Sequence, residues 1–141
     1  MSAYSLRRLL WGGPSATIAA VLVNLLYYAL TKALGEQYLI PLDGHSSNLT
    51  PMPFLMPVIV TLVPGLLATI LFGLLIRFSR SPTVVFLSVC AAALILSFGG
   101  PYYLPAASLQ TKILLSGMNL VGTAIISGGI LLLSLRRTKN P

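Results

Sequence analysis

Four long apolar segments exclude a fold that is stable in water. They cover residues 15–34, 54–76, 83–98 and 113–135. A helix rises 1.5 Å per residue, so crossing the hydrocarbon core of a bilayer takes about 20 apolar residues. The first, second and fourth segments meet that length. The third has 16 residues, and we expect it to extend into Pro82 or Gly99–Gly100, or to lie where the bilayer is thin.

The composition agrees with a membrane protein. Hydrophobic residues make up 56% of the chain and charged residues only 8%, whereas an ordinary soluble domain has about 25% charged residues. A transmembrane β-barrel would need segments of about ten residues in which apolar and polar residues alternate, but these runs are continuous. The sequence therefore predicts an all-α protein with a single transmembrane domain over residues 1–141, an integral membrane four-helix bundle of antiparallel up-down hairpins.

The charges predict the orientation of the chain. Nine Lys and Arg residues stand against two acidic residues, for a net charge of +7. Four spans bring the N-terminus, the second link and the C-terminus to one side, with the basic residues Arg7, Arg8, Arg77, Arg80, Arg136, Arg137 and Lys139. The other side carries Lys32 and Lys112 against Glu36 and Asp43, which sum to zero. Because cytoplasmic loops are rich in Lys and Arg, we expect a multi-pass protein of the plasma membrane with both termini in the cytoplasm.

Small and weakly polar residues recur at helical spacing within the apolar segments. Thr61, Gly65, Thr69 and Gly73 follow one another at intervals of four in the second segment. Helices in lipid associate through small residues and polar contacts. Packing within the bundle is the favoured interpretation of these stripes, and a face for another protein or an apolar cofactor is the alternative. The candidate packing or partner contacts are Asn24, Tyr28, Thr61, Pro64, Gly65, Thr69, Gly73, Asn119 and Thr123.

Asn24 and Asn119 are the most informative of these residues. An amide in hydrocarbon costs several kcal/mol unless it forms hydrogen bonds. Each side chain should therefore face a partner rather than lipid. Hydrogen bonding between helices, worth about 0.6–2 kcal/mol per contact, is the favoured interpretation, and contact with a ligand is the alternative.

Pro64 and Gly65 lie well inside the second segment and predict a bend there, because proline removes a backbone hydrogen bond. Broken helices also occur at transport sites. Such sites normally carry charged or readily ionisable groups, and the apolar segments have no Asp, Glu, Lys, Arg or His at mid-depth. A packing kink is the favoured interpretation.

Motifs for catalysis and metal binding are missing from the sequence. It has no GxSxG, P-loop or HExxH pattern and no pair of carboxylates within a segment. Asp43 and His45, with Glu36 nearby, fall short of a zinc site, which needs three or four ligands. The single cysteine, Cys90, excludes an intramolecular disulfide. We expect no catalytic residues and no metal site.

Three short motifs lie along most of the chain. They are Asn24 in the first segment, Leu62-Val63-Pro64-Gly65-Leu66-Leu67 running on to Arg77, Arg80, Pro82 and Phe86, and Met118-Asn119-Leu120 in the last segment. This order resembles a family of small four-span bacterial membrane proteins of unknown function. The resemblance implies a four-span fold and supplies no activity. In that family the position of Asn119 is often His, so Asn here argues against a proton relay or a histidine ligand.

These features predict a non-catalytic integral membrane protein. The expected role is an accessory or structural subunit packed within a larger membrane complex, for example an energy-transducing respiratory or photosynthetic assembly. Its partners would be membrane lipids and other transmembrane subunits. Nucleic acid is not expected, because the charges lie at the ends of apolar runs. No cofactor is predicted, although the outward faces could contact lipid, quinone or pigment.

Two alternatives stay open. A small oligomeric transporter or channel would need a water-filled path near Asn24, Thr61 and Asn119. A membrane enzyme acting on lipid or quinone would need a pocket at the outer face near Asp43 and His45.

Overall fold

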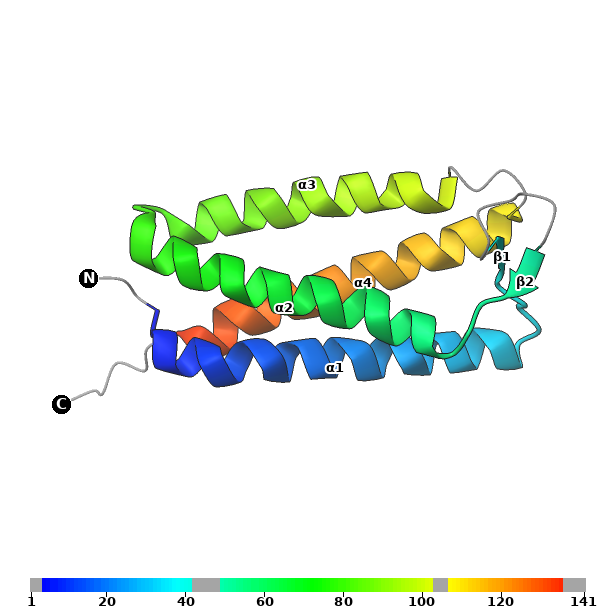
Figure 1. Ribbon diagram of the computed structural model, residues 1–141, viewed down its shortest axis with the longest axis horizontal. Coiled ribbons are helices and arrows are strands. Elements are labelled where there is room, and N and C mark those ends of the chain that lie inside the picture. Colours follow the sequence, from blue (N-terminus) through cyan, green and yellow to red (C-terminus); the bar gives the residue numbers. More distant parts are fainter. Residues whose placement is uncertain (1–3, 42–48, 103–106, 136–141) are drawn as a thin grey trace.

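The computed structural model describes residues 4–41, 49–102 and 107–135. Its four long helices lie side by side (Figure 1): α1 (Leu6–Ala33), α2 (Leu55–Phe78), α3 (Pro82–Tyr102) and α4 (Leu109–Ser134). All four are long and apolar enough to cross a membrane. The predicted all-α bundle of four membrane-spanning helices is confirmed.

Helix α1 begins at Leu6, well before residue 15, where the first apolar segment begins. The helix runs unbroken through Gly12, Gly13 and Pro14, although glycine and proline have the lowest helix propensities. Tertiary packing explains the difference. A Cβ atom on Gly12 would lie 2.7 Å from Leu133 Cβ, and one on Gly13 would overlap the Thr69 side chain. The absent side chains let α1 approach its neighbours closely.

The ends of α3 and α4 also extend beyond their apolar segments. Helix α3 starts at Pro82, a favourable first position for proline, and its 21 residues give a length of ~32 Å. It is therefore long enough to cross a bilayer without local thinning. Helix α4 starts at Leu109 because Ser108 caps it, with Ser108 Oγ accepting a hydrogen bond of 3.1 Å from the Thr111 amide.

A short β-hairpin lies in the long connection between α1 and α2. Strand β1 (Leu39–Pro41) pairs antiparallel with β2 (Leu49–Pro51), with Ile40 opposite Thr50. These strands are not among the predicted elements. The hairpin packs apolar side chains onto the end of the bundle, where Ile40 and Met52 join a cluster with Tyr28 and Met118.

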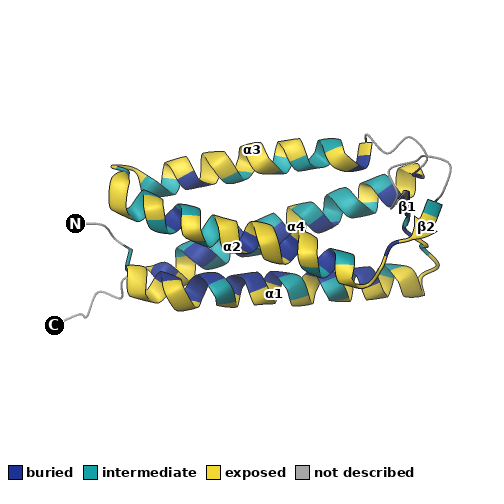
Figure 2. Cartoon of the chain, viewed as in Figure 1, coloured by how far each residue is buried: buried dark blue, intermediate teal, exposed yellow. Residues whose placement is uncertain are grey.

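Helix α1 is the best-packed helix and α3 the most peripheral (Figure 2). Helix α1 packs extensively against α4 and α2, whereas α3 contacts mainly α4 and touches α2 less. A second apolar cluster lies at the opposite end from the hairpin. Its buried members are Leu9, Ala16, Ala20, Phe72, Phe86, Ile126 and Ile130.

The two ends of the bundle differ in charge. The end without the hairpin carries Arg7, Arg8, Arg77 and Arg80 and is called the arginine end. There the Ser5 amide donates to the Ser134 carbonyl at 3.0 Å, so the first and last described residues lie together. The opposite, hairpin end carries Lys32, Lys112 and Glu36 among the described residues.

Candidate functional site

Helices α1 and α2 interlock through a reciprocal pair of Gly-x-x-x-Thr motifs. Thr17 of α1 lies over Gly65 of α2, and Thr69 of α2 lies over Gly13 of α1. Each hydroxyl donates to the glycine carbonyl four residues earlier on its own helix, at 2.9 Å for both threonines. The hydroxyls are therefore satisfied internally, and their methyl groups fill the space above the glycines. Gly73 continues this face, and a Cβ atom added to it would lie 3.4 Å from Leu9 Cδ2, an ordinary contact distance.

Asn24 lies where three helices meet. Its side chain is only 3% exposed, and its Nδ2 donates to Thr61 Oγ1 of α2 at 2.9 Å. A Cβ on Gly122 of α4 would lie 2.9 Å from the same nitrogen. The amide faces protein rather than lipid. Its Oδ1 atom has no hydrogen-bond partner.

Asn119 and Thr123 lie on α4 in a looser setting. Asn119 Nδ2 is 3.5 Å from the Ser97 carbonyl of α3, the outer limit of a hydrogen bond. The Thr123 carbonyl accepts from Ser127 Oγ at 2.7 Å. Both residues are half-buried, and both line the cavity described next.

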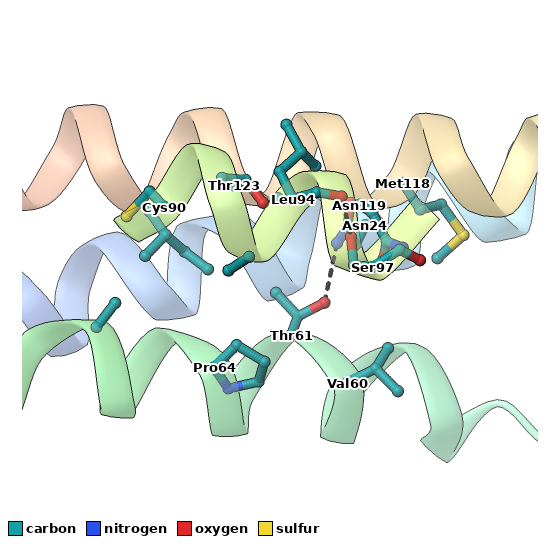
Figure 3. Close-up of a pocket in the computed structure, with 14 residues that line it drawn as sticks. Asn24, Val60, Thr61, Pro64, Cys90, Leu94, Ser97, Met118, Asn119 and Thr123 are labelled. Atoms are coloured by element: carbon teal, nitrogen blue, oxygen red, sulfur yellow. Dashed lines mark hydrogen bonds between the residues drawn. The ribbon is translucent and has the colours of Figure 1, made fainter. Parts of the chain in front are cut away.

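A cavity of about 220 Å³ separates α2, α3 and α4, and Figure 3 shows its labelled lining residues. Its polar lining includes Asn24, Thr61, Ser97, Asn119 and Thr123. Apolar side chains form most of the remaining wall: Val60, Pro64, Ala68, Ala93, Leu94, Met118 and Ile126. Five of the predicted residues therefore line one cavity: Asn24, Thr61, Pro64, Asn119 and Thr123. The other three on α2 lie in its interface with α1: Gly65, Thr69 and Gly73.

Pro64 lies within α2, which is one helix from Leu55 to Phe78. Proline has no amide proton to give to the carbonyl four residues earlier, which belongs to Val60. Val60 also lines the cavity. The bend predicted at Pro64 stays a prediction, but the proline does lie at the cavity wall.

Tyr28 belongs to the hairpin end. Its hydroxyl donates to the Met52 carbonyl at 2.7 Å, and the centroid of its ring lies 5.1 Å from the centroid of the Tyr38 ring. Tyr38 is fully buried, and its hydroxyl shares a hydrogen bond with Thr31. Burial raises the pKa of Tyr38 above its ordinary value. Tyr28 therefore anchors the chain that leads into α2.

Two polar contacts at the bundle ends were not predicted. At the hairpin end, Glu36 accepts a hydrogen bond of 2.8 Å from Thr111 Oγ1 of α4. At the arginine end, Arg8 Nη1 donates to the Leu135 carbonyl at 2.8 Å. The packing of Gly13 is also not predicted, because the first apolar segment begins only at residue 15. The four-residue spacing of Gly13 and Thr17, matched by Gly65 and Thr69, is the signal that could have revealed it.

Several predicted features lie outside the described residues, including Asp43, His45, Arg136, Arg137 and Lys139. Within the described part of the chain, no group of three or more His, Cys, Asp or Glu residues could hold a metal ion.

Comparison with known proteins gives one match. Neither the curated proteins nor the solved structures contain a protein that matches the chain. A family model covers residues 4–139, nearly the whole chain. The expected relationship to a four-span family without known activity is confirmed: this chain belongs to the family of unknown function DUF6069.

Proposed function

We propose that this protein is a non-catalytic accessory subunit that packs beside the helices of a larger membrane complex, of which an energy-transducing assembly is one example. The supporting observation is the outer face of α3. Of its 21 residues, only Phe86 and Pro101 are buried. Ser88 and Ala92 lie exposed at four-residue spacing on that helix, with Ala91 beside them.

Small residues at four-residue spacing let a second helix approach closely in lipid. The same pattern already operates inside this molecule, where Gly13 and Thr17 of α1 meet Gly65 and Thr69 of α2. A helix face that contacts only lipid tails has no need of small residues, because large apolar side chains would be sufficient there. An exposed small-residue face on a peripheral helix therefore favours a helical partner.

The orientation belongs to the same proposal. Among the described residues, the arginine end carries four positive charges and the hairpin end carries two lysines and one glutamate. The positive-inside tendency favours a plasma-membrane protein with the arginine end in the cytoplasm.

Affinity purification in a mild detergent, followed by mass spectrometry, tests the subunit role. We expect a defined membrane partner to co-purify with the wild type and to be lost from Ala92→Phe, which fills the small-residue face. Ala124→Phe, at an exposed position of α4, is the matched control and should keep the partner. A protein that purifies alone, and whose deletion destabilises no complex, would contradict the proposal.

A small transporter or channel is the second candidate, and the cavity at Asn24, Thr61 and Asn119 favours it. Transport requires a path that opens to both sides. Swelling of proteoliposomes in glycerol or a small polar amide should then exceed that of protein-free liposomes and fall in Ala93→Phe, since Ala93 lines the cavity. Equal swelling with and without protein would exclude transport of these solutes.

A further inference from the structure

A shallow groove of about 660 Å³ lies between α1 and α4 at the arginine end of the bundle. Its lining residues are Arg7, Arg8, Trp11, Gly12, Ser15 and Leu133. Gly12 brings α1 so close to α4 that an added Cβ atom would lie 2.7 Å from Leu133 Cβ. Two arginines and an indole therefore share one groove where the two helices meet.

The positive charge of the groove has no acidic partner in the described part of the chain. The whole sequence has only two acidic residues. Glu36 lies at the hairpin end, where it accepts a hydrogen bond from Thr111, and Asp43 lies outside the described residues. Arg8 Nη1 donates to the Leu135 carbonyl at 2.8 Å. That neutral acceptor holds the guanidinium in place but leaves its charge and most of its five N–H donors for an anionic ligand.

The order of residues along α1 matches the layers of a bilayer. Trp11 is 78% exposed, and tryptophan favours the membrane–water interface. With a rise of 1.5 Å per residue, Trp11 lies about 6 Å and Ser15 about 12 Å along the helix from Arg7. The interfacial layer of each leaflet is about 5–8 Å thick. The arginines therefore lie at the depth of lipid phosphates, and the groove continues past Trp11 to the depth of the acyl chains.

We propose that this groove binds a phospholipid whose head group carries a net negative charge. Its phosphate oxygens accept hydrogen bonds from the guanidinium groups of Arg7 and Arg8, and one acyl chain lies along α1 beside Trp11. Guanidinium groups match phosphate through paired N–H···O bonds. A zwitterionic phospholipid has the same phosphate, but the cation of its head group cancels the charge that would attract it to two arginines. The site needs neither a partner subunit nor transport through the cavity, so it stands apart from both proposed functions.

Trp11 provides a direct test, because it is the single tryptophan of the chain and it lines the groove. Lipids with brominated acyl chains quench tryptophan fluorescence on contact. The full chain is reconstituted in mixtures of phosphatidylglycerol and phosphatidylcholine, with bromine on one lipid at a time. We expect phosphatidylglycerol to bind at Trp11 at least about fivefold more strongly than phosphatidylcholine. That ratio corresponds to about 1 kcal/mol, the typical contribution of one arginine near an anionic lipid surface.

Two matched double variants separate the groove from the charge of the whole end. Arg7→Gln with Arg8→Gln should bring the two lipids to nearly equal quenching. Arg77→Gln with Arg80→Gln removes the same charge from exposed positions at the same end that do not line the groove, and it should keep the preference. Arg7→Gln alone leaves the contact of Arg8 with Leu135 in place. It should also lower the preference, so the test does not depend on the folding of the double variant.

Three results in the bromine experiment would overturn the proposal. They are equal quenching by the two lipids in the wild type, stronger quenching by phosphatidylcholine, and equal loss of preference in the two double variants. The last result would mean that the lipid follows the charge of the whole end. Inorganic phosphate supplies the same oxygens without acyl chains, and it should not relieve quenching by brominated phosphatidylglycerol at an ionic strength matched with sodium chloride. Relief would assign the groove to a free anion instead of a lipid.

Discussion

Helix α2 meets its neighbours in opposite ways on its two sides, and adjacent residues mark the difference. Gly65 faces α1, where the Thr17 side chain leaves no room for a Cβ atom. Pro64 faces the cavity that separates α2 from α3 and α4. Lipid tails are as apolar as leucine, so burying apolar surface does not drive helices together in a bilayer. Close contact forms where small side chains permit it, and space is left where they do not.

The largest expected effect comes from breaking the close interface. Gly13→Leu would force a side chain into Thr69, and overpacking of this kind typically costs 1–3 kcal/mol, so we expect a loss of at least about 3 kcal/mol for a whole leucine. Thermal unfolding of the purified protein in detergent measures the effect. Gly128→Leu is the matched control, because a Cβ atom there meets nothing within 4 Å. Equal melting temperatures for the two variants would contradict the close packing of Gly13 against Thr69.

A smaller effect on stability is expected at Asn24, which lies between the α1–α2 interface and the cavity. Asn24 and Thr61 share one interhelical hydrogen bond, and such bonds couple by about 0.6–1.7 kcal/mol in a membrane protein. A double-mutant cycle with Asn24→Ala and Thr61→Val isolates this coupling. A coupling energy indistinguishable from zero would show that the bond does not stabilise the α1–α2 contact.

The cavity side of α2 should tolerate added side-chain volume and can gain stability from it. Ala93→Leu places methyl groups in the cavity, and we expect it to raise stability by up to about 1 kcal/mol, as cavity-filling changes commonly do. The same substitution at Ala16, where Gly129 approaches its Cβ position closely, should destabilise. Strong destabilisation by Ala93→Leu would mean that α2 and α3 are as tightly packed as α1 and α2.

The smallest effect concerns pH at the hairpin end. Because burial raises the pKa of Tyr38, the folded state favours the neutral phenol over the phenolate. This contribution is complete below the ordinary pKa of 10.0 and is lost as pH rises through the higher folded value. The melting temperature should therefore fall as the pH rises above 10.0, and by less in Tyr38→Phe. An identical decline in both proteins would remove Tyr38 as the cause.

The sequence predicts the helices more completely than the contacts at the candidate site. The length and hydropathy of the segments predicted four spans, and a four-residue spacing drew attention to Thr61, Gly65, Thr69 and Gly73. That spacing places residues on one face of one helix but does not say which neighbour the face meets. The partner of Gly65 is Thr17, and the glycine beneath Thr69 lies in a stretch that composition alone placed outside the first segment.

The sequence by itself determined that this chain spans a membrane four times, because a bilayer admits only segments whose backbone hydrogen bonds are satisfied internally. It also determined that the described basic residues gather mainly at one end. Only the tertiary structure decided that Asn24 contacts Thr61, that α1 packs against both α2 and α4 and that a cavity lies beside α3. These features depend on which helix faces meet, and apolar helices in an apolar solvent carry little information about that choice until their small and polar side chains are in contact.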